Sequence, residues 1–209
     1  MEFNDDNILR FWQWFVKNEN TIKECVENTS SKSKEYVVEQ MNEHILGQGV
    51  LTWDIGLNDS KEWFLMLSPN GDSDMLKVSE RIIGEAPEHM NWQFHASKPA
   101  KIWDRQFMVY DDYMDELFID ASDWHFITFE EEDGKLDLVI EAKNISHLNP
   151  EVAESASEQF VIQEIGEANS IIYFSSVVVV SNLESEDQSL KSPVSELNAF
   201  VKEYINSIS

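Results

Sequence analysis

The chain has 209 residues, of which 42% are hydrophobic and 26% are charged. Its 40 acidic residues outnumber its 15 basic residues, which gives a formal net charge of −25 at pH 7. This length and apolar content are typical of one folded domain and exclude wholesale disorder. A surface this negative repels phosphate backbones and anionic lipid headgroups, so neither nucleic acid nor membrane is an expected partner. The same charge favours cations and basic proteins.

Cysteine usage and hydropathy indicate the compartment. The single cysteine, Cys25, excludes an internal disulfide and any metal site built from several cysteines. No apolar run approaches the roughly 18 residues that a membrane span needs. The acidic residues at the N-terminus lack the basic region of a signal peptide. We therefore expect a soluble, cytoplasmic protein.

Residues 1–47 are predicted to form a helical N-terminal segment. Apolar residues recur at the helical spacing of three and four in both halves of it. The first predicted helix turns inward the side chains of Ile8, Phe11, Trp12, Phe15, Ile22 and Val26. The second turns inward those of Val37, Val38, Met41 and Ile45, and it ends near Gly47.

Residues 50–142 are predicted to form a β-rich core. Residues 51–57 alternate between apolar and polar, as in a half-buried strand, and 63–67 form a central return strand that is apolar on both faces. A helix follows from Asp74 to about Glu85. Further strands are expected at 92–96 and 107–110, and residues 117–129 are compatible with one strand or with two joined near Ser122. An Asp-Gly hairpin signal then leads into a strand at 136–140.

Residues 149–209 are predicted to form an αβα segment. The capping residues Asn149 and Pro150 start a helix, residues 171–180 form a buried strand, and Pro193 opens the final helix. Together the elements predict one α+β domain over residues 1–209. Its sheet is mainly antiparallel, and the N-terminal helices, the mid-chain helix and the two C-terminal helices pack on one face.

The order of several aromatic and turn residues resembles a family of uncharacterised bacterial proteins. The resemblance rests on Phe11-Trp12-Gln13-Trp14-Phe15, then Ala86-Pro87, then Trp92-Gln93-Phe94 with Lys98-Pro99. The family has an N-terminal Phe-x-x-Trp-Phe segment and an Ala-Pro…Trp-x-Phe core. The resemblance covers most of the chain and implies a single bacterial domain. It assigns no catalytic residue, because the family has no established activity.

Common catalytic and nucleotide-binding patterns are missing from the sequence. There is no Gly-x-Ser-x-Gly elbow and no glycine-rich phosphate loop. Cys25 lies among acidic neighbours, which disfavour a reactive thiolate. Residues 70–74 superficially resemble a calcium loop, but the twelfth position from Asn70 is Arg81 rather than glutamate, so they predict a polar turn with an Asp cap. We expect no cofactor.

A cluster of acidic residues and histidines supports an alternative hypothesis. Asp120, Asp123 and His125, joined across the sheet by His95, are residue types that bind zinc, iron or harder cations. Asp123 and His125 share a strand face, but Asp120 points to the other face of a regular strand. The alternatives are a metal-dependent enzyme and a set of exposed charges on a sheet.

The acidic segment 111–141 supports the leading hypothesis, because its 31 residues hold 12 acids and one base. Such a surface can steer a basic protein or protect an edge strand from aggregation. The predicted binding residues are Asp111, Asp112, Asp115, Glu116, Glu130, Glu131, Glu132 and Asp133, with Trp103 as an aromatic anchor.

We therefore expect a non-catalytic interaction module that sequesters a basic partner, as immunity proteins do with toxins. The chain is expected to be a monomer or a dimer. A structural subunit that dimerises through an exposed sheet edge is a further possibility.

Overall fold

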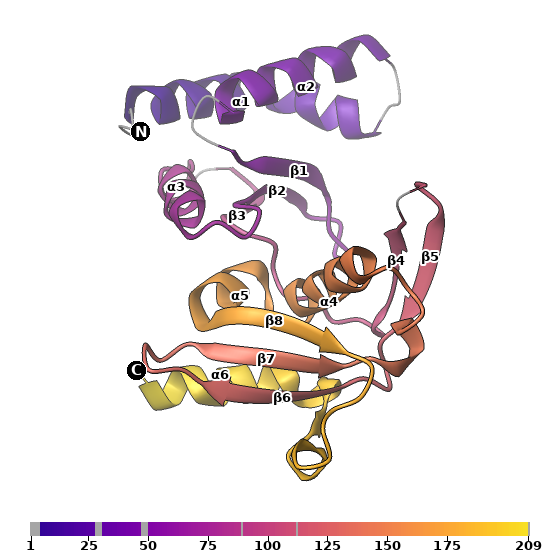
Figure 1. Ribbon diagram of the computed structural model, residues 1–209. Coiled ribbons are helices and arrows are strands. Elements are labelled where there is room, and N and C mark those ends of the chain that lie inside the picture. The colour runs from indigo at the N-terminus through magenta and orange to yellow at the C-terminus, as the bar shows by residue number, and fades with distance from the viewer. Residues whose placement is uncertain (1–4, 28–30, 47–49, 89, 112, 209) are drawn as a thin grey trace. The chain divides into compact units, whose positions relative to one another are not determined.

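A computed structural model describes the chain except for residues 1–4, 28–30, 47–49, 89, 112 and 209. Helices and mostly antiparallel sheets form an α+β fold, which confirms the predicted fold class (Figure 1). The chain divides into two compact units, Met1–Lys98 and Pro99–Ser209, and each is described by itself. That residues 1–209 form a single domain stays a prediction.

The first unit combines three helices with a three-stranded sheet. Strand β2 is central, antiparallel to β1 and parallel to β3, with helix α3 connecting the two parallel strands. The central position of the strand that is apolar on both faces was predicted. The elements are α1 (Asp5–Glu27), α2 (Ser31–Leu46), β1 (Thr52–Leu57), β2 (Trp63–Ser68), α3 (Ser73–Gly84) and β3 (Trp92–His95).

The core of the first unit is rich in aromatic side chains. Five of the six residues predicted to face inward from α1 are buried, and the indole N–H of Trp12, one of these five, donates a 2.8 Å hydrogen bond to the carbonyl of Ile82 in α3. Val26 and Val38 were predicted to face inward but are 39% and 36% exposed. Val38 follows the buried Val37, and one residue along a helix turns the side chain by about 100°.

Helix α3 begins at a side-chain cap. The carboxylate of Asp72 accepts hydrogen bonds from the backbone N–H groups of Asp74 and Met75, at 2.8 and 3.0 Å. These are donors that the first turn of a helix leaves unpaired. The predicted polar turn with an Asp cap is therefore confirmed.

The cap gives a first testable prediction. Replacing Asp72 with alanine removes the acceptor for both N–H groups and is expected to lower the free energy of unfolding by about 1 kcal/mol. Asp72→Asn keeps a side-chain oxygen in place and is expected to be near neutral. Urea unfolding followed by circular dichroism measures both, and equal losses in the two variants would contradict a capping role.

The second unit holds a four-stranded sheet in the order β8-β7-β6-β9 and a separate two-stranded ribbon, β4-β5. Strands β7 and β8 run parallel, and the other pairs are antiparallel. The elements are β4 (Gln106–Tyr110), β5 (Glu116–Asp120), β6 (His125–Glu130), β7 (Leu136–Glu141), η1 (Lys143–Ile145), α4 (Pro150–Ile165), α5 (Glu167–Tyr173), β8 (Phe174–Val180), η2 (Asp187–Ser189), β9 (Ser192–Pro193), η3 (Val194–Glu196) and α6 (Leu197–Ile208).

Two boundaries in this unit bear on the sequence predictions. Residues 117–129 form two strands, because β5 ends at Asp120 and β6 begins at His125. The strand predicted at 171–180 begins only at Phe174, because residues 171–173 belong to α5. It was also predicted to be buried, but β8 is an edge strand and Phe174 is its one buried residue. The first three residues of that apolar run suit a buried helix as well as a strand, so periodicity alone could not separate the two.

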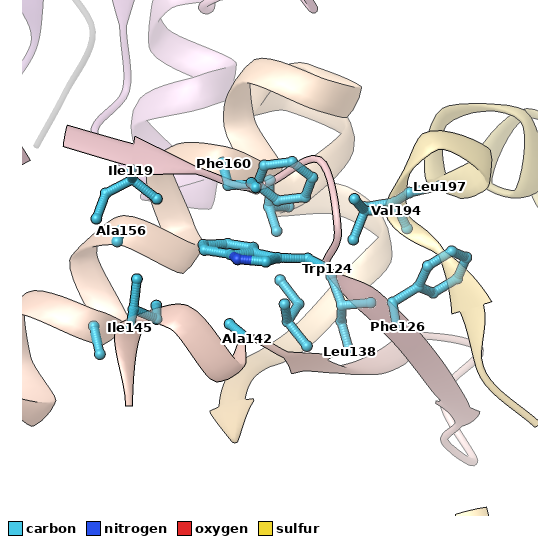
Figure 2. Packing of buried hydrophobic residues seen from close by; sticks show 14 of the residues in the cluster. Ile119, Trp124, Phe126, Leu138, Ala142, Ile145, Ala156, Phe160, Val194 and Leu197 are labelled. Carbon is cyan, nitrogen blue, oxygen red and sulfur yellow. The ribbon is translucent and has the colours of Figure 1, made fainter. Parts of the chain in front are cut away.

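Trp124 lies at the centre of the second unit's core. Its indole packs against Phe160 of α4 with ring centroids 5.2 Å apart, and Figure 2 shows side chains from strands and helices around it. Leu138 of β7 and Leu197 of α6 belong to the same buried cluster. Helices α4 and α6 therefore share one core with the sheet.

Candidate functional site

The ribbon β4-β5 is joined to the sheet at a hydrogen-bonded corner. The indole N–H of Trp124 donates to Oδ1 of Asn144, and Nδ2 of Asn144 donates to the carbonyl of Asp120, both at 2.7 Å. The backbone N–H of Ala121 also donates to the carbonyl of Arg105 at 3.0 Å. These bonds connect the end of β5 to the core and so set the direction in which the ribbon leaves it.

One face of the ribbon is buried and the other is exposed. Phe107, Val109 and Ile119 belong to the core cluster and alternate with the outward-facing residues of the two strands. On the outer face Met108 lies directly opposite Phe118, and Tyr110 lies opposite Glu116. The hydroxyl of Tyr110 donates a 3.2 Å hydrogen bond to the Glu116 carboxylate.

The outer face and the turn of the ribbon expose large apolar side chains together. Phe118 is 61% exposed, Tyr110 54% and Met108 39%, and in the turn Tyr113 is 86% and Met114 73% exposed. A cluster of this kind commonly marks an interaction surface. None of these five residues was predicted as a binding residue from the sequence. The alternation in 106–110 and 116–120 was the available signal, but it does not say whether a second layer covers the outer face.

Acidic residues occupy the same ribbon. Asp115 and Glu116 are exposed, whereas the half-buried Asp111 accepts hydrogen bonds from the backbone N–H groups of Tyr113 and Asp115, at 2.8 and 2.9 Å. Asp111 therefore holds the turn, whereas the carboxylates of Asp115 and Glu116 are exposed, and that of Glu116 also accepts the hydrogen bond from Tyr110. The predicted binding residue Asp112 lies outside the described residues.

The other predicted acidic residues form a separate group. Glu130, Glu131, Glu132 and Asp133 are all exposed at the turn between β6 and β7. Figure 1 shows this turn beside the C-terminal end of α6, and the hydroxyl of Tyr204 on α6 donates to the carbonyl of Gly134 at 2.8 Å. In Figure 1 the far end of the β4-β5 ribbon lies on the opposite side of the unit from this turn. The acidic segment thus supplies two distinct clusters.

Trp103 is directed into the second unit. Its indole N–H donates to the Glu164 carboxylate at 3.1 Å, and its ring lies 5.7 Å from that of Phe107 and 5.9 Å from that of Phe160. The half-buried ring and its bonded N–H make Trp103 a structural residue of this core rather than the free aromatic anchor that was expected.

Three of the four residues of the metal hypothesis line one cavity. Asp120, Asp123 and His125 surround a space of about 350 Å³ together with Glu141 and Lys143. The hydroxyl and backbone N–H of Ser122 bind Asp120 and hold the pKa of that carboxyl below its usual value. His95 lies in the other unit at the end of β3. Within the described part of the chain, no group of three or more His, Cys, Asp or Glu side chains is arranged to hold a metal ion.

The carboxyl group of Glu141, which also lines this cavity, has a pKa well below its ordinary value. Burial disfavours its charged form, but hydrogen bonds from Lys191 Nζ at 2.9 Å, the Leu183 N–H at 3.1 Å and Gln188 Nε2 at 3.3 Å outweigh burial. The net effect lowers the pKa of Glu141 from 4.5 to about 2. The carboxylate therefore ties the end of β7 to the segment that leads into β9.

No protein-family model, no curated protein and no solved structure matches the chain. The resemblance to an uncharacterised bacterial family thus stays an expectation. In the described part of the chain, no helix has the length and apolar character needed to cross a membrane.

The corner gives a second prediction. Asn144→Ala removes the side-chain oxygen that accepts the hydrogen bond from the indole N–H of Trp124. The rest of the Trp124 side chain is packed in the core. The free energy of unfolding is expected to fall by about 1 to 2 kcal/mol. Ser146→Ala is the control, since its exposed hydroxyl donates to the nearby carbonyl of Lys143. Chemical denaturation of both variants is the measurement, and a loss no larger than the control's would contradict the role of Asn144.

Glu141 gives a pH-dependent prediction. Because its folded pKa of about 2 lies below the ordinary value of 4.5, its ionisation stabilises the fold above pH 4.5 and that contribution is lost as the pH falls toward 2. The shift corresponds to about 3 kcal/mol. Glu141→Gln is expected to be less stable than wild type at pH 7, with the gap closing in acid.

The measurement is urea unfolding at pH 7, 4 and 2.5. Glu154→Gln, an exposed position on α4, serves as a control that should follow wild type throughout. A gap for Glu141→Gln that stays constant over this range would show that ionisation of Glu141 does not carry the effect.

Proposed function

We propose that the protein is a non-catalytic binding module that sequesters a basic protein partner through the β4-β5 ribbon. The observation that carries this proposal is the combination on one ribbon of exposed apolar side chains and exposed carboxylates. Phe118 and Tyr113 are more than half exposed, and the neighbouring Asp115 is exposed in the turn. An apolar anchor with a charged rim is typical of protein interfaces.

The two chemical components make different contributions to binding. The acidic turn and the net charge of −25 attract a basic protein over a distance and raise the rate of encounter. Phe118 and Met108, directly opposite each other, offer apolar surface whose burial holds the complex together. The proposal thus assigns the anchor to the ribbon's outer face in place of Trp103.

The most concrete form of this function is that of an immunity-like protein that neutralises a basic toxin. We propose that it acts in the cytoplasm, in keeping with the single Cys25. A metal-dependent enzyme is not favoured by any observation on the described residues, since three of the candidate ligands share a cavity without forming a metal-binding group.

The proposal predicts an effect of charge on the rate of association. The triple variant Asp112→Lys, Asp115→Lys and Glu116→Lys reverses charge at the ribbon but keeps Asp111, which holds the turn. At low salt its association rate constant with the partner is expected to fall by about tenfold or more, with a smaller change in dissociation. Surface plasmon resonance gives both rates.

The partner for this measurement comes from a pull-down with the native lysate at low salt and at about 1 M salt, where the Debye length falls to about 3 Å. A matched control variant, Glu130→Lys, Glu131→Lys and Glu132→Lys, makes the same change in charge at the β6-β7 turn. The proposal expects only the ribbon variant to lose most of the association rate. Equal rates for wild type and the ribbon variant, or no basic protein retained at low salt, would refute it.

A further inference from the structure

We propose that the partner contributes an extended basic segment that adds as a third strand to the free edge of β5. This inference rests on the proposed function, because it specifies how the basic partner is held. It follows from the hydrogen-bond pattern of the ribbon, the elements around its two edges and the charges along β5.

The ladder between β4 and β5 determines which backbone groups point outward. The N–H of Ala121 donates to the carbonyl of Arg105, and the N–H of Asp111 donates to the carbonyl of Asp115. In an antiparallel pair, residues that exchange hydrogen bonds alternate with residues that do not. The pairs Met108–Phe118 and Tyr110–Glu116 lie between the hydrogen-bonded pairs and are therefore non-hydrogen-bonded pairs of the ladder. Their N–H and C=O groups therefore point away from the ladder, toward the two edges.

Two side-chain hydrogen bonds agree with this assignment. On the β4 edge, Nε2 of Gln159 in α4 donates to the carbonyl of Met108 at 3.3 Å. On the β5 edge, Asn144 donates to the carbonyl of Asp120. The β4 edge is thus contacted by α4, and among the described residues the bond to the β5 edge lies at its end, where the corner begins.

The middle of the β5 edge is open. Figure 1 shows β5 as the outer strand of the ribbon, with β4 between it and α4. No hydrogen bond between the backbone of Phe118 and another described residue completes this edge. A free strand edge is a template for pairing with another chain, and strand addition is a recurring way to bind an extended segment.

The charges along β5 decide which segment fits. Glu116 and Asp120 stand two residues on either side of Phe118 and share its outer face. A second copy paired antiparallel about Phe118 would place Glu116 opposite Asp120 of the other chain, and facing like charges are destabilising. A basic segment instead places one apolar side chain beside Phe118 and a basic side chain beside each acid. The geometry thus specifies a basic-x-apolar-x-basic pattern.

A short peptide tests strand addition directly. The probe is a capped heptapeptide with threonines at alternate positions, lysines at its second and sixth positions and valine at its centre. It is added to the ¹⁵N-labelled full chain while amide hydrogen exchange is followed by NMR. At a peptide concentration ten times Kd, exchange of the Phe118 N–H is expected to slow about tenfold, because only the free chain exchanges.

A backbone-methylated peptide is the matched control. N-methylation of the central valine keeps every side chain and charge but removes the N–H that would pair with β5. This peptide is expected to bind at least about tenfold more weakly, since one strand-pairing hydrogen bond is lost and the methyl group blocks approach to the edge.

Two substitutions at one position separate backbone from side chain. Phe118→Ala and Phe118→Pro both remove the aromatic ring, but only proline removes the outward N–H, while the β4-β5 ladder keeps its bonds. Weaker binding in the alanine variant and no binding in the proline variant are expected. The melting temperature of each variant shows whether the unit is folded, and the methylated peptide tests the same point on the wild-type chain.

The outcomes separate this inference from the proposed function. Equal binding of both peptides, with unchanged exchange at Phe118, overturns strand addition but leaves binding of a basic partner standing. Failure of both peptides to bind the folded wild-type chain also overturns strand addition. The charge-reversal experiment on the ribbon then decides the proposed function independently.

Discussion

The corner made by Trp124 and Asn144 is the interaction on which the second unit depends. Trp124 fills the centre of the core, and its indole N–H binds Asn144, which also holds the carbonyl of Asp120 at the end of β5. A buried tryptophan combines a large apolar surface with one polar group that needs a partner. Here that partner connects the core to the ribbon, so one side chain both packs the sheet and orients the candidate binding element.

The acidic residues of the chain have two distinct roles. Glu141 and Glu164 are buried and paired, Glu141 with Lys191 at 2.9 Å and Glu164 with Arg105 at 2.8 Å. Such carboxylates join separate segments, since a buried charge requires partners. Asp115, Glu116 and Glu130 are exposed and shape the field around the protein. Net charge counts both groups alike, which explains why the structural carboxylates were not identified from composition.

Residue patterns predicted several parts of the fold because they depend on local physics. The α1 stripe at Ile8 and Phe11 is buried as helical periodicity indicates, and the polar turn at Asp72 caps α3. The negative charge of segment 111–141 was also evident from local composition. The apolar part of the site was not, because Phe118 and Phe107 are similar residues in similar strands. Packing on the core buries Phe107 at 7% exposure and leaves Phe118 at 61%.

By itself, the sequence determined the α+β class, most helix and strand positions, and the excess of negative charge, because periodicity, capping residues and composition act over a few neighbouring residues. Tertiary structure alone decided that Trp103 faces Glu164, that the acidic segment 111–141 separates into two clusters, and that β4-β5 stands apart from the four-stranded sheet. These features depend on which distant residues cover each strand face and edge. Whether a side chain is exposed depends on which distant segments pack over it, and not on its residue type alone.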